Sequence, residues 1–201
     1  MNELEFKIPL ANYFSQDHEA ALNFEFPFDF NRRRCDLLVA SRKEIVGIEI
    51  KSDIDNLDRL EEQLFSYYKC FNRVYVACGK RHYKDISKIN GRFGIIYISD
   101  NVLTIKRKAR VKKNISILSA LDMCDKTMLE KWSNLKSANK SALILNIINN
   151  FTSDEIYSIF RESVYGKVSR VYEAFLSEKG SVITSEDITL LSLKSMKLGV
   201  L

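Results

Sequence analysis

Two neighbouring β-rich runs carry charged residues whose types and spacing suit metal-ion chemistry. Asp36 lies in the first run, and Glu49 and Lys51 lie in the second. A two-residue turn at Arg42-Lys43 would join the runs into a hairpin in which Asp36 faces Glu49, with Cβ atoms roughly 4.5–5.5 Å apart. Lys51 shares the face of Glu49, because side chains alternate along a strand. The pattern predicts two carboxylates and an ammonium group on one face of a sheet.

The facing carboxylates would repel each other unless a cation lay between them. Their hard oxygen ligands suit Mg²⁺ or Mn²⁺, which waters and a substrate phosphate would complete. The turn lacks the Gly or Asn that two-residue hairpins favour, and a one-residue slip would move Asp36 to the opposite face. The predicted metal site therefore depends on this register.

The segment after the second run adds a polar stripe. Apolar residues recur at helical spacing from 55 to 71, which predicts a helix that Asp55 or Asp53 can cap. Arg59, Gln63 and Tyr67 follow one another at i, i+4 and i+8, so they line a second stripe of this helix. The stripe can lie over the carboxylate pair, where Gln63 could orient a water or a phosphate and Arg59 could neutralise one.

These residues resemble the motif of the PD-(D/E)XK nuclease superfamily, in which an Asp precedes a (D/E)-X-K on the adjacent strand. Here the motif reads Asp36, then Glu49-Ile50-Lys51. The segment QLFSY at 63–67 is similar to the QxxxY motif of the RecB-type branch of that superfamily.

The run at 49–77 is also similar to small prokaryotic and viral proteins that carry this nuclease-like domain before a helical tail. The resemblance covers roughly residues 22–113 well and the tail only loosely. It implies a restriction-endonuclease-like fold, with a mixed central sheet and flanking helices.

The resemblance further implies hydrolysis of phosphodiester bonds, of DNA more than of RNA. Asp36 and Glu49 would bind Mg²⁺ or Mn²⁺, with the Ile50 carbonyl as a further ligand. Lys51 would position the attacking water, help to deprotonate it, and stabilise charge on the phosphate. Gln63 and Tyr67 would belong to the same catalytic group.

Three features depart from the superfamily pattern. Arg34 and Cys35 precede Asp36, where many members have a Pro. An acid from the preceding helix often completes the metal site, and Glu19 is the better candidate because Glu25 falls in a predicted strand. The four cysteines do not match the iron–sulfur set found in part of the RecB-type branch, so no cluster is implied.

Basic residues give the chain a net charge of +5, and the excess lies in residues 1–113. Such patches can bind phosphates, although a solvated basic face gives the same composition. A solvated edge strand explains the basic stretch at 106–113 nearly as well, because charges there also block edge pairing. The residues predicted to contact nucleic acid are Arg32, Arg34, Arg59, Lys106, Arg107, Lys108 and Arg110.

The first half of the chain alternates in the manner of an α/β domain, and the second half is helical. Strands are predicted at 22–28, 35–40, 45–51, 73–78, 94–99 and 102–106. Two capping boxes, Thr152 with Glu155 and Thr184 with Asp187, predict helices in the second half. We therefore expect a nuclease-like α/β domain at 1–113 and a small all-α domain at 114–201.

The composition is that of an ordinary globular protein, with 201 residues, of which 46% are apolar and 28% charged. No apolar run reaches the ~18 residues of a membrane span, and the start of the chain has no secretory signal, so the cytoplasm is expected. The four cysteines and two histidines lack metal-ligand spacing, which predicts reduced, partly buried thiols.

The helical tail carries no catalytic pattern and no net charge. We expect it to bind a protein partner, to form a homodimer or to cap the core. The alternative function is a catalytically inactive module on the same fold that binds nucleic acid or a protein.

Overall fold

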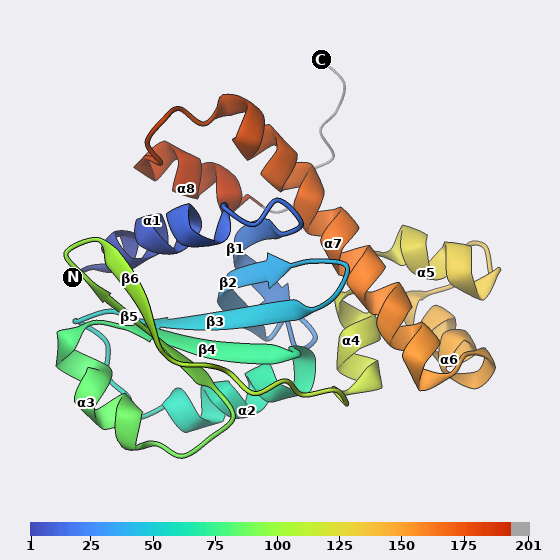
Figure 1. The fold of residues 1–201 in the computed structure, drawn as a ribbon. Coiled ribbons are helices and arrows are strands. Elements are labelled where there is room, and N and C mark those ends of the chain that lie inside the picture. Colours follow the sequence, from blue (N-terminus) through green and yellow to red (C-terminus); the bar gives the residue numbers. More distant parts are fainter. Residues whose placement is uncertain (194–201) are drawn as a thin grey trace.

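The computed structural model describes residues 1–193, and its centre is a mixed six-stranded sheet in chain order (Figure 1). The strands are β1 (Ala21–Phe28), β2 (Arg33–Ala40), β3 (Ile45–Lys51), β4 (Arg73–Cys78), β5 (Gly94–Ser99) and β6 (Val102–Arg107). The pairs β3–β4 and β4–β5 are parallel, and the other three pairs are antiparallel. The expected α/β class with a mixed sheet and flanking helices is confirmed.

Helices connect the parallel strands. Helix α2 (Leu60–Cys70) joins β3 to β4, and α3 (Lys80–Lys88) joins β4 to β5. The predicted helix at 55–71 begins five positions later than expected. The Asp55 carboxylate accepts hydrogen bonds from both the backbone N–H and the hydroxyl of Ser52. The Asp55 side chain therefore stabilises a turn with Ser52 and does not cap helix α2.

An N-terminal helix, α1 (Glu3–Phe14), was not predicted. Its start has a capping box in which Asn2 and Glu5 exchange side-chain to backbone hydrogen bonds. Pro9 lies inside the helix. A proline at this place in the sequence argues against a helix, because it lacks the backbone N–H that a helix interior uses. The capping box was the available signal for this element.

Between the sheet and residue 193 the chain forms five helices, as the helical pattern of the second half predicted. They are α4 (Ile117–Met123), α5 (Lys126–Ser133), α6 (Lys140–Asn150), α7 (Ser153–Glu178) and α8 (Ser185–Leu191). Both predicted capping boxes are present, at the starts of α7 and α8. The long helix α7 packs against β1 and β2, and α8 packs against α1 and β1 (Figure 1).

The core is continuous between the sheet and these helices. One cluster of buried residues runs from Phe6 in α1, through the strands, to Phe175 in α7 and Leu191 in α8. Helices α4, α7 and α8 all pack against β1, the first strand of the sheet. The change from strands to helices near residue 114 therefore does not divide the core, because both parts contribute to the same buried cluster.

The predicted turn at Asp100-Asn101 joins β5 to β6. Both residues have positive φ, 52° and 61°, the conformation that a two-residue hairpin turn requires. At the centre of the sheet, Gly47 allows a close approach. A Cβ atom there would lie 2.4 Å from the ring of Phe71, so a larger residue would displace the ring that packs on β3.

The four cysteines are free and buried, in agreement with the predicted reduced thiols. Trp132 in α5 is half-buried and packs edge-on against Phe151. No helix within residues 1–193 combines the length and apolar character of a membrane span.

Candidate active site

The register of the β2–β3 hairpin brings the two predicted carboxylates together. Leu37 pairs with Ile48 and Ala40 with Ile45, so the same register sets Asp36 opposite Glu49. At the turn, the Ser41 N–H donates to the Glu44 carbonyl at 3.0 Å, which leaves Arg42 and Lys43 as a two-residue turn. The predicted register is confirmed.

The Asp36 carboxyl is held by the backbone of the next strand. Its Oδ2 accepts a hydrogen bond from the Ile50 N–H at 2.6 Å. Burial raises the pKa of Asp36 well above its usual range, and the facing Glu49 carboxylate raises it further, against the lowering effect of the Ile50 N–H. Burial and the facing carboxylate therefore both favour the protonated form of Asp36.

Glu49, Lys51 and Gln63 form a closed polar group beside Asp36. The Lys51 Nζ lies 3.0 Å from Glu49 Oε1 and donates to Gln63 Oε1 at 2.8 Å. The Gln63 amide in turn donates to Glu49 Oε1. Glu49 is 3% and Lys51 6% exposed, so the ion pair is shielded from solvent. Helix α2 thus brings Gln63 to the carboxylate pair, as predicted, whereas Arg59 of the predicted stripe lies just before the helix and is exposed.

Tyr67, one helical turn after Gln63 in α2, contacts the backbone of Asp36. Its hydroxyl accepts a hydrogen bond from the Asp36 backbone N–H at 3.2 Å, and its ring forms a three-ring cluster with Phe28 and Phe71. Burial foremost raises the pKa of Tyr67 well above its usual range, so the hydroxyl stays protonated. This places Tyr67 as a positioning residue for Asp36.

A second charged group, which was not predicted, adjoins the site from α1 and β1. Lys7 Nζ lies 2.6 Å from Glu3 Oε1 and 2.9 Å from Glu25 Oε1. The charges of Glu25 and Glu3 also raise the pKa of Asp36, after burial and Glu49. The site and its immediate surroundings therefore contain four carboxyl groups and two ammonium groups. The carboxyl groups belong to Asp36, Glu49, Glu25 and Glu3, and the ammonium groups to Lys51 and Lys7.

Glu25 occupies an unusual backbone position in this group. It has φ of 55° within β1, between the paired residues Phe24 and Phe26. A non-glycine residue rarely adopts this conformation, which costs roughly 1–3 kcal/mol and tends to occur at functional sites. Glu25 does lie in a strand, as predicted. Its position in β1 nevertheless leaves it close enough to Asp36 to influence that carboxyl.

The donor set fits a hard divalent cation. The oxygen donors are the Asp36 and Glu49 carboxylates and the neighbouring Ile50 carbonyl, and Mg²⁺ commonly binds through one or two carboxylates while keeping waters. Within residues 1–193, no three His, Cys, Asp or Glu side chains form a metal-binding group. A cation here would thus depend on water and substrate oxygens for its remaining ligands.

Comparison with known proteins identifies the family of this chain. Residues 1–192 match the model of a family described as bacteriophage P4 protein cII. The chain belongs to the bacteriophage P4 protein cII family. Protein cII of Enterobacteria phage P4 is 31% identical over 77 residues, which are 38% of this chain and 29% of that relative. The match thus spans less than a third of the relative's length.

Among solved structures, a protein of unknown function from Silicibacter pomeroyi is similar to this cII-family chain. The two share 17% sequence identity and a TM-score of 0.48, over 75% of this chain and 92% of the other. Neither relative's name states a reaction.

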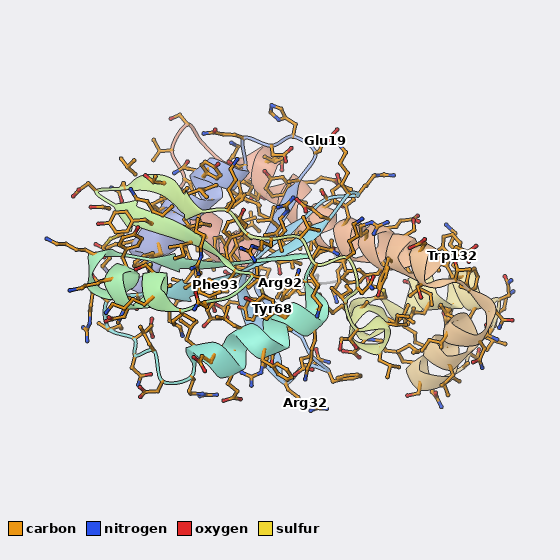
Figure 2. The ribbon with its side chains drawn as sticks, turned by 60° about the horizontal axis from the view of Figure 1, so that its bottom comes forward. Glu19, Arg32, Tyr68, Arg92, Phe93 and Trp132 are labelled. Carbon is orange, nitrogen blue, oxygen red and sulfur yellow. The ribbon has the colours of Figure 1, made fainter. Side chains whose placement is uncertain are left out.

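Glu19 of the cII-family chain is not brought to the candidate site, contrary to expectation. Its Oε2 lies 2.5 Å from Lys43 Nζ at the turn end of the β2–β3 hairpin, and both side chains are exposed. Ala21 pairs with Ala40 at that end, several residues along the strand from Asp36. Figure 2 shows Glu19 at the periphery of the molecule. Glu25 and Glu3 are the acids that this fold places near Asp36.

The predicted basic residues separate into exposed and internal ones. The exposed residues are Arg32, Arg34, Arg59, Lys106, Lys108 and Arg110. Arg107 is half-buried instead: it donates to the carbonyls of Phe93 and Ile89 at 3.0 and 3.1 Å, and its guanidinium lies 4.2 Å from the Phe93 ring centroid. These contacts give Arg107 a structural role in the β5–β6 region.

Proposed function

We propose that this cII-family protein is a metal-dependent nuclease of the PD-(D/E)XK type, with a restriction-endonuclease-like sheet, that hydrolyses phosphodiester bonds in DNA. The observation that carries the proposal is the convergence of Asp36, Glu49, Lys51 and Gln63 from two strands and one helix. Asp36, Glu49 and Lys51 share one face of the sheet, and Gln63 reaches them from α2. Carboxylates that can bind a metal ion, a lysine beside them and an amide that can orient water are the groups that phosphodiester hydrolysis requires.

In this proposal Asp36, Glu49 and the Ile50 carbonyl hold Mg²⁺ or Mn²⁺. The bound ion would supply Lewis acidity and lower the pKa of a coordinated water. Ile50 keeps the Asp36 carboxyl oriented through its N–H, and Tyr67 fixes the Asp36 backbone. These contacts hold the carboxylate in place before any ligand arrives.

Lys51 and Gln63 act on the water and the phosphate. The Lys51 ammonium, 3.0 Å from Glu49 Oε1, places a positive charge where negative charge builds on the phosphate. Gln63 bridges Lys51 and Glu49 with its amide, and the same amide can orient the attacking water. The low exposure of the ion pair increases its electrostatic effect, because water screens it less.

One observation favours a second candidate function. Glu49 and Lys51 form a buried ion pair, and Gln63 hydrogen-bonds to both of them. These contacts can stabilise the fold without any bound ligand. A catalytically inactive module that binds nucleic acid or a protein would use the group in this way.

Metal binding separates the two candidates. In calorimetric titrations with Mn²⁺, the nuclease proposal expects binding by the wild type and by Glu19→Gln, an exposed carboxylate on the neighbouring segment. It expects no binding by Asp36→Ala or Glu49→Gln. A folded wild-type protein without Mn²⁺ affinity, or with affinity unchanged in Asp36→Ala, would favour the inactive module.

A further inference from the structure

A separate pocket of about 730 Å³ lies on the opposite side of α2 from the candidate site. Phe65 is two positions from both Gln63 and Tyr67, so it points away from their face of the helix. The pocket lies between the C-terminal half of α2, the turn before β5 and the segment after β6. Its main lining residues are Phe65, Tyr68, Lys69, Arg92, Lys112 and Lys113.

Hydrogen bonds hold the walls of the pocket together. The Tyr68 hydroxyl accepts from the backbone N–H groups of Arg92 and Phe93 at 3.1 and 2.9 Å. Lys112 Nζ donates to the Tyr68 carbonyl at 2.8 Å, and the Lys112 N–H donates to the Asn72 carbonyl. Figure 2 shows Tyr68, Arg92 and Phe93 gathered beside α2. The pocket is therefore preformed.

An aromatic ring stands open to solvent at this pocket. Phe65 is 63% exposed, although burial of a phenylalanine normally stabilises the fold. The Lys69 ammonium lies 4.3 Å from the centroid of its ring. An exposed ring beside a cation combines the two contacts that a nucleotide requires, one for the base and one for its phosphate.

The pocket is strongly positive. Four of its lining residues are cations, none is acidic, and within residues 1–193 none of the four forms an ion pair with a carboxylate. Arg92 and Lys113 are exposed. Lysines near the end of α2 also offset the helix dipole, but Arg92 and Lys113 belong to other segments. The charge of the pocket is complementary to a polyanion.

We infer that this pocket binds an unpaired nucleotide of a single-stranded nucleic acid, with the base against Phe65 and the phosphates against the surrounding cations. Its volume lies within the range of roughly 300–1,000 Å³ for ligand pockets. The strand is single because a duplex keeps its base faces stacked and out of reach of a side-chain ring. The inference does not rest on the nuclease proposal, since a strand can bind without being cut.

The test is fluorescence anisotropy in EDTA, which measures binding without cleavage. Labelled single-stranded DNA and RNA of about twelve nucleotides are compared with a duplex of the same sequence. We expect the single strands to bind more tightly than the duplex. We expect Phe65→Ala to weaken single-strand binding by roughly tenfold, and Phe65→Trp to retain it. Tyr13→Ala, an exposed aromatic on α1, is the matched control and keeps wild-type affinity.

The charge contribution is tested by the salt dependence of binding. Lys113→Gln should lower the slope of log affinity against log salt by about one, while Lys131→Gln, in α5, should leave it unchanged. The inference is overturned if no single strand binds, if Phe65→Ala binds as the wild type does, or if the duplex binds equally well. A protein captured through Phe65 in the absence of strand binding would also overturn it. A nuclease that fails to cleave while these binding results hold would contradict only the proposed function.

Discussion

At the scale of single residues, the site is defined by Asp36, whose ionised form is disfavoured by burial and by the facing Glu49 carboxylate. Asp36 faces Glu49, and Lys51 pairs with Glu49 rather than with Asp36. Glu25 and Glu3 add further negative charge, which Lys7 offsets in part. The ionised form of a half-buried carboxyl in such surroundings is costly unless a cation is bound beside it.

Removing this charge should stabilise the metal-free protein. Asp36→Asn keeps an oxygen for the Ile50 N–H but ends the repulsion with Glu49, so we expect the Tm in EDTA to rise by about 2–4 °C per kcal/mol relieved. The stabilisation that Mn²⁺ gives the wild type should be lost. Differential scanning calorimetry measures both, with the exposed Asp58→Asn as control. A lower Tm in EDTA with an unchanged Mn²⁺ effect would contradict this account.

The buried thiols predict how stability depends on pH. Burial raises the pKa of Cys70, Cys78 and Cys124 to about 12, whereas an unfolded thiol titrates near 8.5. The folded state thus keeps protons that the unfolded state releases, and this contribution is complete below about pH 8.5 and lost as the pH rises toward 12. Urea unfolding under reducing conditions should show a lower free energy of unfolding at about pH 10 than at about pH 8. A rise over that interval would refute the burial of these thiols.

Some site residues could be predicted from the sequence and others could not. The facing of Asp36 and Glu49 follows from turn length and strand alternation, which are local. Lys7 and Glu25 escaped prediction because their approach depends on how α1 packs on the sheet and on a positive φ in β1. No local pattern encodes either feature.

At the scale of secondary-structure elements, two glycines in different surroundings should respond to alanine in opposite directions. Gly166 lies within α7, and a Cβ atom there would meet no other atom within 4 Å. Gly166→Ala should stabilise the protein by roughly 0.5–1 kcal/mol, because glycine has the larger entropy cost in a helix. Denaturant unfolding measures the change.

Gly94→Ala should destabilise the protein in the same measurement. A Cβ atom at position 94 would lie 2.3 Å from the Tyr75 ring and 2.6 Å from the Ala109 backbone N, so the chain after β6 would have to move. We expect a loss of at least about 1–3 kcal/mol. Equal effects of the two substitutions would show that α7 or the β4–β5–β6 packing differs from this description.

The strands were more predictable than the helices, for physical reasons. The strands at 45–51, 73–78 and 94–99 were predicted with their observed bounds, because buried β-branched runs end at polar turns. Helix α3 was missed because only His82 and Ile86 are buried in it, which gives too short an apolar stripe. Helix α1 was missed for a different reason, because it contains Pro9 and proline is unfavourable inside a helix.

At the scale of the whole molecule, the helical half stabilises the sheet that carries the site. Asn23 in β1 donates to the Leu191 carbonyl at 2.7 Å, and Arg161 in α7 donates to the Arg42 carbonyl at the hairpin turn at 3.2 Å. The sequence predicted a change of secondary structure near residue 114. It could not predict how far α7 would extend across β1, because that depends on which apolar faces meet.

We therefore expect the chain to unfold in one cooperative step. Trp132 is the only tryptophan and lies in α5, so its fluorescence reports on the helical half, while far-UV circular dichroism reports on the whole chain. The two transitions in urea should coincide. A Trp132 transition at clearly lower urea would show that the helical half unfolds separately.

The proposed nuclease activity is tested most directly by a cleavage assay on the purified full chain. Labelled single- and double-stranded DNA and RNA are incubated with Mn²⁺, Mg²⁺ or EDTA, beside Lys51→Ala and the exposed control Lys43→Ala. Circular dichroism verifies that each variant is folded. The account predicts cleavage that requires the metal, persists in Lys43→Ala and falls at least about a hundredfold in Lys51→Ala. No cleavage by the folded wild type, or equal cleavage by Lys51→Ala, would contradict it.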